Sequence, residues 1–319
     1  MYEYDYKIAV IGGGTGLSTI LRGLKRFPMD ITAIVTVADD GGSSGTLRED
    51  FDVPPPGDIR NVLVALSDAE PLVNELFQYR FEEGTGLTGH PVGNLLLAAM
   101  TNITGNFARA VQNLSEVLNV RGRILPVCNE ALCLCAEYDD GEVVTGESNI
   151  PNPDKKIKRV YYENSCSALK EAVKAVKEAD LVVLAPGSLY TSIIPNLLFS
   201  EIRQIIESTK AKFVYCCNIM SQPGETTGFS VSDHIKSIEE HVGFRFVDSV
   251  LVNDAKVKPS VVKRYHKDGS HPIEIDHELL EEMNINVIQS RMVDYNERNE
   301  VRHDSQKIAA IIFSLLLDV

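Results

Sequence analysis

Four short runs of almost uninterrupted apolar and β-branched residues constrain the fold of this chain most strongly. The runs lie at 6–11 (YKIAVI), 30–39 (DITAIVTVAD), 180–186 (DLVVLAP) and 212–218 (KFVYCCN). Strands without polar alternation are covered on both faces, which is typical of a parallel sheet. Segments with apolar residues at intervals of three and four separate the runs, as helices do. The alternation predicts a doubly wound, mostly parallel, Rossmann-like α/β sheet with helices on both faces.

Residues from about 120 to 163 show a different strand pattern. The segments 122–128 (GRILPVC), 131–138 (ALCLCAEY) and 142–148 (EVVTGES) resemble antiparallel strands, with a tight turn at 139–141. We interpret this region as a small β-rich insertion or an extension of the sheet. Because no repeat, low-complexity tract or long linker divides the chain, we expect residues 1–319 to form one domain.

The net charge of the chain and the length of its apolar segments limit the partners that we expect. The formal net charge of −14 opposes a broad electrostatic contact with nucleic acid, so no nucleic-acid partner is expected. The apolar stretch at 308–317 is half of the roughly 20 residues that span a bilayer, which predicts a buried helix and no membrane span. Acids near the N-terminus argue against a signal peptide. The six cysteines lack a CxxC pair, as expected for buried thiols in the cytoplasm.

A glycine-rich turn follows the first apolar run. Its residues are Gly13, Gly14, Thr15, Gly16 and Leu17, and they lead directly into a helical pattern. Ligands of parallel sheets bind beyond the carboxyl ends of the strands, and a helix N-terminus offers free N–H groups to a phosphate. The turn is not a full GxGxxG motif and lacks the lysine of a P-loop, so a tight turn without a ligand is the alternative.

The segment 37–50 (VADDGGSSGTLRED), which follows the second run and is expected to form one loop, combines acids with glycines and hydroxyls. One carboxylate of Asp39 and Asp40 is suited to a ribose hydroxyl or a magnesium ion. We expect the glycine amides, with Ser43 and Ser44, to face a phosphate or a substrate hydroxyl. Acids that only cap a turn are the alternative.

Two further segments place polar side chains before helices. In PPPGDIRN (54–61), Asp58 is interpreted either as a helix cap or as a second metal or substrate carboxylate near Asp40, with Arg60 beside it. In TGHPVGNLLLAAM (88–100), His90 and Asn94 precede an apolar helix. A histidine in such a position is more often a structural hydrogen-bonding group than a base.

The later strands end in similar turns. Gly187, Ser188 and Leu189 follow the third run and repeat the anion-binding pattern of the first turn. Asn218 ends the fourth run, and Gln222 and Thr226 follow it toward the same crevice. Arg302 and His303 precede the last helical pattern, which Asp304 or Ser305 is expected to cap. Arg302 is suited to a phosphate, although a surface ion pair is the simpler interpretation.

Six motifs in this order closely resemble the gluconeogenesis factors (YvcK-type proteins), a branch of the superfamily of 2-phospho-L-lactate transferase (CofD). The motifs are GGGTG, DDGGSSG, PPGDIRN, GHPVGNLLL, PGSLYTSIIPNLL and QPGETTG, and the resemblance extends from about residue 8 to 316. It implies a doubly wound cytoplasmic protein that binds nucleotides, notably UDP-sugars. It also implies a need for the protein in cell morphology during growth on gluconeogenic carbon sources, without an established reaction.

The resemblance also implies roles for single residues. Gly13 to Gly16, with Thr15, are implied to form the nucleotide cradle, and Gly187, Ser188 and Leu189 its opposite wall. Asn218 and Arg302 are implied to border the pocket. Acids at the positions of Asp40 and Asp58 serve magnesium and the acceptor in the transferase branch. The GGSSG stretch is richer in glycine than that of the transferase, which argues against a deazaflavin acceptor.

Two functions are therefore weighed. The first is a regulatory protein that binds a UDP-sugar or an NAD-like dinucleotide, forms a homodimer, and contacts cell-wall synthesis or regulatory proteins. The alternative is a magnesium-dependent transferase that acts on a nucleoside diphosphate-linked substrate, since positioning and charge neutralisation do most of the work in phosphoryl transfer. An NAD-dependent oxidoreductase ranks last, because the sequence offers no acid for a hydride site.

Overall fold

The computed structural model describes residues 6–68, 71–82, 84 and 86–317. The expectation that no signal peptide is present depends partly on residues 1–5, which lie outside this part of the chain. Within the described residues, no helix is long and apolar enough to span a bilayer.

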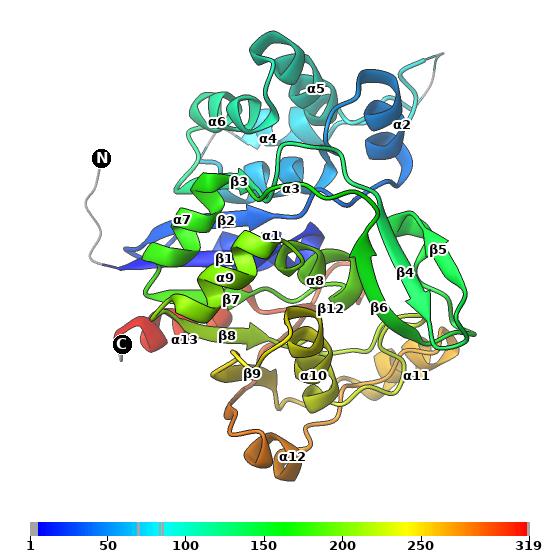
Figure 1. Ribbon diagram of the computed structural model, residues 1–319, viewed down its shortest axis with the longest axis vertical. Helices are drawn as coiled ribbons and strands as arrows, with labels where there is room; N and C mark the ends of the chain where they lie inside the picture. The colour runs from blue at the N-terminus through cyan, green and yellow to red at the C-terminus, as the bar shows by residue number, and fades with distance from the viewer. Residues whose placement is uncertain (1–5, 69–70, 83, 85, 318–319) are drawn as a thin grey trace.

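A parallel sheet forms the centre of the molecule (Figure 1). Within the described residues its seven strands lie in the order β10-β9-β8-β7-β1-β2-β3, and each neighbouring pair is parallel. The strands are β1 (Lys7–Gly12), β2 (Asp30–Val35), β3 (Arg123–Pro126), β7 (Leu181–Leu184), β8 (Lys212–Cys216), β9 (Ser249–Asn253) and β10 (Asn286–Ser290). The four apolar runs of the sequence form β1, β2, β7 and β8, as predicted.

The strand order reverses between β1 and β7. The chain moves from β1 to β2 and β3 on one side, and from β7 to β8, β9 and β10 on the other. Right-handed connections in opposite directions place their helices on opposite faces of the sheet. The result is the doubly wound fold that the sequence predicts, and the reversal marks the expected ligand crevice.

Helices cover both faces of the sheet (Figure 1). They are α1 (Gly14–Leu24), α2 (Gly42–Phe51), α3 (Gly57–Leu66), α4 (Pro71–Gln78), α5 (Val92–Thr104), α6 (Phe107–Val117), α7 (Lys170–Glu178), α8 (Ile194–Leu197), α9 (Ser200–Ser208), α10 (Val231–Val242), α11 (Pro259–Lys267), α12 (His277–Glu282) and α13 (Ser305–Leu317). Helix α1 packs between α3 and α13, whereas α7 packs against α9. The main hydrophobic core includes side chains from Ile8 to Leu316, and a smaller cluster contains Ile219, Met220, Val257, Val261 and Val301.

The remaining strands form two small antiparallel sheets beside the strand ends. One contains β4 (Leu134–Tyr138), β5 (Val143–Thr145) and β6 (Ile157–Tyr162), and the other pairs β11 (Val293–Tyr295) with β12 (Val301–His303). The predicted turn at 139–141 connects β4 to β5, where Gly141 N–H donates to Tyr138 O at 3.0 Å. A short 3-10 helix (Glu147–Asn149) follows β5.

Three expectations require correction. The segment 122–128 was expected to be antiparallel, but β3 pairs in parallel with β2, because the helices between residues 42 and 117 return the chain to the same end of the sheet. The β-rich extension therefore begins after β3 instead of at residue 120. The loop expected at 37–50 contains α2 from Gly42 onward. Helix α13 was expected to be buried, yet only one side of it is, and Leu317 is 55% exposed.

Candidate functional site

A cavity of about 710 Å³ lies at the carboxyl ends of β1, β7 and β8, where the strand order reverses. Its lining contains twelve of the residues that the sequence singled out: Gly13, Gly14, Thr15, Gly16, Asp39, Asp58, Gly187, Ser188, Asn218, Gln222, Arg302 and His303. The turns after β1 and β7, which are far apart in the chain, therefore meet at one cavity. This is the location that the strand order predicts for a ligand.

The turn after β1 approaches the opposite wall closely. Gly14 has a φ of +61°, a conformation that favours glycine. A Cβ atom at Gly16 would lie 1.9 Å from Pro186 O, so only glycine allows α1 to contact the turn after β7 in this way. Gly13, which precedes α1, provides no side-chain cap, and this leaves the first N–H groups of the helix beside the cavity.

The turn after β7 is fixed by the side-chain amide of Asn218. Gly187 N–H donates to Asn218 Oδ1 at 2.9 Å, and Asn218 Nδ2 donates to Gly187 O at 2.7 Å. The amide thus pairs with both backbone groups of Gly187, as a neighbouring strand would. Asn218 Nδ2 also donates to Gln222 Oε1 at 3.2 Å, which joins the segment after β8 to the same wall.

Ser188 begins a π-helical turn, Leu189–Ile193, and its hydroxyl is occupied by neighbours. Ser188 Oγ donates to Glu225 Oε2 and accepts from Thr191 N–H at 3.1 Å. Glu225 also accepts from Tyr190 N–H at 3.3 Å, and burial raises the pKa of this carboxyl group. These bonds hold the wall rigid. The Ser188 hydroxyl is consequently a positioned polar group instead of a free nucleophile.

Five acids line the cavity, namely Asp39, Asp58, Glu147, Glu225 and Asp268. Burial raises the pKa of Asp58 to about 7, the negative charge of Asp39 adds to this rise, and a hydrogen bond from Gly14 N–H offsets part of it. Burial likewise raises the pKa of Glu147 to about 7, with further contributions from Asp39 and Asp40. The negative charge of Asp39 therefore makes ionisation of Asp58 and of Glu147 less favourable, and a cation placed among these acids would reverse this effect.

Asp58 does not have the capping role that one interpretation gave it. Pro56 precedes α3, and no side chain caps that helix. The Asp58 carboxylate instead accepts from Gly14 N–H, across the cavity wall at the start of α1. One of the amides expected for a phosphate is therefore used by an acid of the protein itself.

Asp40 turns away from the cavity, and its neighbour Asp39 lines it instead. Ser148 N–H donates to Asp40 Oδ1 at 2.8 Å, which ties the segment before α2 to the loop after β5. Within the described residues, no group of three or more His, Cys, Asp or Glu side chains has the arrangement of a metal site. A metal shared by Asp40 and Asp58 stays a prediction.

Arg302 and His303 reach the cavity from β12, a strand that the sequence analysis did not identify. Among the described lining residues, Arg302 is the one lysine or arginine. Its guanidinium pairs with Glu300 and donates to Val301 O at 2.8 Å. His303 Nε2 donates to Cys217 O at 3.1 Å, and burial lowers the pKa of His303 to about 4. His303 is thus a neutral donor at neutral pH.

Six predicted site residues lie outside the cavity lining: Leu17, Asp40, Ser43, Ser44, Asn94 and Leu189. Leu17 and Leu189 point into the hydrophobic core, which follows from their apolar side chains. Further polar lining residues were not indicated one by one by the sequence patterns: Glu147, Thr191, Glu225, Tyr265, Asp268 and Ser270. Thr191 and Glu225 belong to the quoted motifs PGSLYTSIIPNLL and QPGETTG, so only their individual roles were missed.

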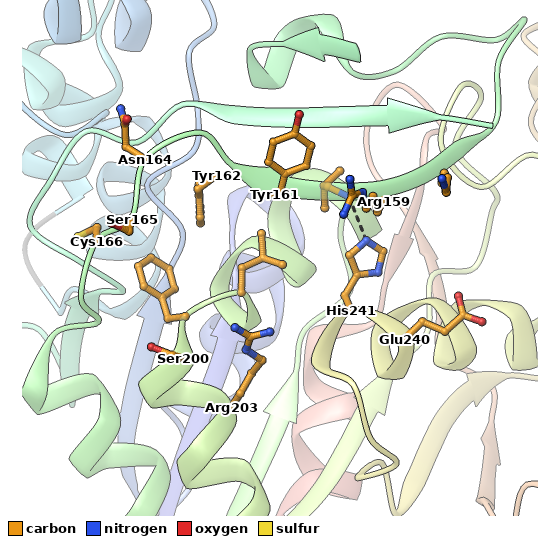
Figure 2. Close-up of a pocket in the computed structure, with 14 residues that line it drawn as sticks. Arg159, Tyr161, Tyr162, Asn164, Ser165, Cys166, Ser200, Arg203, Glu240 and His241 are labelled. Carbon is orange, nitrogen blue, oxygen red and sulfur yellow. Dashed lines mark hydrogen bonds between the residues drawn. The ribbon is translucent and has the colours of Figure 1, made fainter. Parts of the chain in front are cut away.

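A second cavity of about 510 Å³ lies between β6, α9 and α10 (Figure 2). His241 of α10 holds β6 there, since His241 Nε2 accepts from Val160 N–H at 3.0 Å and Nδ1 donates to Ser237 O at 2.7 Å. Lys158 and Arg159 on its rim both pair with Glu137. Its lining residues come from β6 and the loop after it, from α9 with the residues before it, and from α10, and not from the turns after β1 and β7. The cavity at the strand ends is therefore the candidate site.

Comparison with known proteins supports the same family as the motifs. The model of the family described as 2-phospho-L-lactate transferase CofD matches residues 8–293. The gluconeogenesis factor of Bacillus subtilis (strain 168) is 52% identical over 311 residues, which cover 97% of this chain and 98% of that protein. The gluconeogenesis factor of Halalkalibacterium halodurans is 50% identical over 306 residues, which cover 96% of this chain and 95% of that protein.

A solved structure extends the agreement to the fold. The crystal structure of a UPF0052-family protein from Bacillus halodurans has a TM-score of 0.94 and 50% identity, and the match covers 97% of this chain and 99% of that chain. The resemblance inferred from six motifs is thereby confirmed over nearly the whole chain. This chain belongs to the 2-phospho-L-lactate transferase CofD family, together with its relatives named gluconeogenesis factor.

Proposed function

We propose that the cavity binds the diphosphate of a nucleotide, either a UDP-sugar or an NAD-like dinucleotide, and that the protein is a regulatory binding protein of the cytoplasm. The observation that carries this proposal is that the Thr15 turn and the Ser188 turn line one cavity at the strand-order reversal. Both turns are rich in glycine and lead into helical segments, whose N–H groups suit phosphate oxygens. Arg302 adds a cation on the same lining.

A magnesium ion fits the acids of the cavity. Asp39, Asp58 and Glu147 would repel a diphosphate unless a cation lay between them. Mg²⁺ is commonly held by one or two carboxylates together with the phosphates of the ligand. Asp39 and Asp58 are the residues that would hold it, and the bound ion would neutralise phosphate charge. Arg302 would orient the diphosphate from the opposite side.

A binding role is favoured over catalysis in this cavity. His303, the one imidazole of the described lining, is kept neutral and donates to a backbone oxygen. The Ser188 hydroxyl donates to Glu225. With its pKa lowered to about 4, His303 is a weak base, and the Ser188 hydroxyl is already bonded, so both groups mainly hold the walls in place.

Titration calorimetry with UDP-glucose, UDP-N-acetylglucosamine and NAD, with and without magnesium, tests the proposal. We expect saturable heat with at least one ligand, and at 100 times the dissociation constant about 2.7 kcal/mol of added stability. Arg302→Gln should weaken binding about 10- to 100-fold, because a charge-assisted hydrogen bond contributes about 1.5–3 kcal/mol. Arg203→Gln, which alters a lining residue of the second cavity, is the matched control and should bind as the parent does.

The absence of saturable heat with all three nucleotides would overturn the proposal. An equal loss of affinity in both arginine variants would show that the ligand does not contact the strand-end cavity. Nucleotide binding that is unchanged without magnesium would show that Asp39 and Asp58 do not hold a metal ion for the ligand.

A magnesium-dependent transferase is the second candidate, and the acids of the cavity favour it. Phosphoryl transfer depends mainly on positioning and charge neutralisation. Asp58 and Glu147, whose pKa burial raises to about 7, are also suited to accept a proton. Release of a nucleoside monophosphate from a nucleoside diphosphate-linked phospholactate, followed by phosphorus NMR, tests this candidate. Turnover that disappears in Asp58→Asn would support it.

We also propose a cellular role in line with the name of the relatives, gluconeogenesis factor. Occupancy of the cavity would change a surface that cell-wall synthesis or regulatory proteins recognise, and the protein would support cell shape during growth on gluconeogenic carbon sources. A homodimer is proposed as the acting form. Deletion of the coding sequence and microscopy on such carbon sources would test the role, and sedimentation would test the dimer.

A further inference from the structure

A hydrogen-bonded chain of four side chains lies among α2, α3 and α5, outside the cavity lining. Arg60 Nη1 donates to Asn94 Oδ1 at 3.1 Å, and Asn94 Nδ2 donates to Ser43 Oγ at 3.1 Å. Ser43 Oγ in turn lies 2.8 Å from His90 Nδ1. Arg60 and Asn94 are buried, whereas Ser43 and His90 are partly exposed. The accessible end of the chain is therefore a serine beside a histidine.

Two of the three hydrogen bonds in this chain have a fixed direction, and the third depends on the tautomer of His90. Arginine only donates, so the Asn94 amide must turn its oxygen toward Arg60 and its nitrogen toward Ser43. Ser43 Oγ accepts from Asn94, and its own hydrogen is left for His90 Nδ1. Ser43 donates to His90 in the ring tautomer that leaves Nδ1 unprotonated. A serine hydroxyl that donates to an imidazole, and whose oxygen is oriented by a third group, is the arrangement of an activated nucleophile.

The buried end of the chain is a cation without an ion pair in the described part of the chain. Arg60 is 6% exposed, its Nη1 and Nη2 donate to the neutral oxygens of Asn94 and Asn61, and its Nε is buried without a partner. A buried charge of this kind favours negative charge nearby. The positive charge of Arg60 acts on Ser43 Oγ through Asn94. This charge stabilises the negative charge that develops on Oγ as the hydroxyl proton leaves.

The residues around Ser43 match the sequence motif of a turn that presents a nucleophilic serine. Residues 41–45 (GGSSG) match G-x-S-x-G, a motif in which serine lies between a strand and a helix. The segment follows β2 and opens α2, with a φ of +44° at Gly42. A Cβ atom at Gly45 would lie 2.2 Å from Asp40 O, so this position requires glycine. No side chain caps α2. The N–H groups of Ser44 and Gly45 donate to Gly41 O, which leaves those of Gly42 and Ser43 for an oxyanion that forms at Ser43.

We propose that Ser43 is a nucleophile toward activated phosphoesters and that His90 is the base that takes its proton. In this step the bond from Ser43 Oγ to phosphorus forms and the bond from phosphorus to the leaving group breaks. The leaving group keeps the electron pair of the broken bond, and the hydroxyl proton moves to His90 Nδ1. Asn94 and Arg60 are positioning residues. The activity is separate from nucleotide binding in the strand-end cavity, and neither depends on the other.

Labelling with an alkyl fluorophosphonate tests this assignment without a natural substrate. The reagent presents a tetrahedral phosphorus with fluoride as the leaving group, so attack by Ser43 gives a stable phosphonyl ester and releases fluoride. Peptide mass spectrometry should find the adduct on Ser43. Ser208, whose hydroxyl donates to Gln204 O on the exposed side of α9, is the internal control and should stay unlabelled. The absence of an adduct on Ser43 in the parent protein would overturn the proposal.

Variants separate an activated nucleophile from a structural hydrogen-bond network. His90→Gln keeps a hydrogen-bond acceptor but removes the base, and should slow labelling of Ser43 at least about 100-fold. Asn94→Ala should slow it less, since Asn94 acts only through the serine. The melting temperature of each variant confirms that it is folded. Labelling of folded His90→Gln at the rate of the parent would show that the network is structural, and would also overturn the proposal.

Discussion

The carboxyl group of Asp58 shows how its surroundings set the charge of a single side chain. A hydrogen bond from Gly14 N–H favours its ionised form, whereas burial and the neighbouring Asp39 oppose that form and raise its pKa to about 7. The unfolded chain ionises the same group near pH 4. Between these values the folded state binds more protons than the unfolded state, so Asp58 lowers the stability of the fold as pH rises from about 4 to 7.

Asp58→Asn should therefore stabilise the protein at pH 8 and leave it almost unchanged at pH 4. Since one pKa unit corresponds to about 1.4 kcal/mol, the expected gain at pH 8 is on the order of 2–4 kcal/mol. Urea denaturation at pH 4, 6 and 8 measures it. Asp154→Asn, at an exposed turn, is the control and should show no such trend. A gain in the free energy of unfolding that does not grow with pH would contradict the raised pKa assigned to Asp58.

At the scale of elements, contact between turns decides the site. Helix α1 and the turn after β7 meet because Gly16 lacks a Cβ atom, and Asn218 fixes that turn from the end of β8. Strands β1, β7 and β8 were predictable from their apolar runs, and the turns after β1 and β7 from their glycines. Their convergence follows from the strand order, which places β7 directly beside β1.

Gly16→Ala should force α1 away from Pro186, because the added Cβ atom would lie 1.9 Å from a backbone oxygen that has little room to move. We expect a loss of about 1–3 kcal/mol in the free energy of unfolding, which is the usual cost of overpacking. Nucleotide affinity should fall as well, since the two walls separate. Gly41→Ala, whose Cβ atom would meet Asp39 Oδ1 at 3.4 Å, is the control, with an expected loss below about 1 kcal/mol. Equal losses in the two variants would argue against close packing at Gly16.

At the scale of the whole molecule, the last helix, α13, covers the side of the first helix, α1, and completes the core there. Helix α13 packs on α1, where a Cβ atom at Gly23 would lie 1.9 Å from Ser305 O, and the rings of Phe27 and Phe313 lie 5.1 Å apart. The α1 that carries the glycine turn is thus held by the C-terminal end of the described chain. The stability of the site depends on contacts between the two ends of the sequence.

Ile312→Ala tests this dependence, because Ile312 on α13 is fully buried. Removal of its side chain should lower the free energy of unfolding by about 2–5 kcal/mol. Ile103→Ala on α5 makes the same chemical change at a side chain that is 78% exposed, and should change it by less than about 0.5 kcal/mol. Chemical denaturation of both variants gives the comparison. Similar values for the two would show that α13 contributes little to the core.

Missed elements share a physical cause. The edge strand β10 and the hairpin strands β11 and β12 are short or partly exposed, so they lack the continuous apolar run that marks a central strand. Helix α2 was expected to be a loop because its first turn contains two glycines and two serines. Such residues are poor helix formers, and here packing outweighs their intrinsic preference.

The sequence by itself determined the parallel sheet, the helices between its strands, the glycine turns and the family, because each of these depends on local periodicity or on an ordered set of motifs. Only the tertiary structure decided which acids share a cavity. Asp39 lines it while its neighbour Asp40 turns to Ser148, and Glu147 joins from beyond β5. The hydrogen-bonded series of side chains from Arg60 to His90 was likewise decided only by the tertiary structure. The direction of a side chain and the burial of a charge depend on residues distant in sequence, and local patterns carry no record of them.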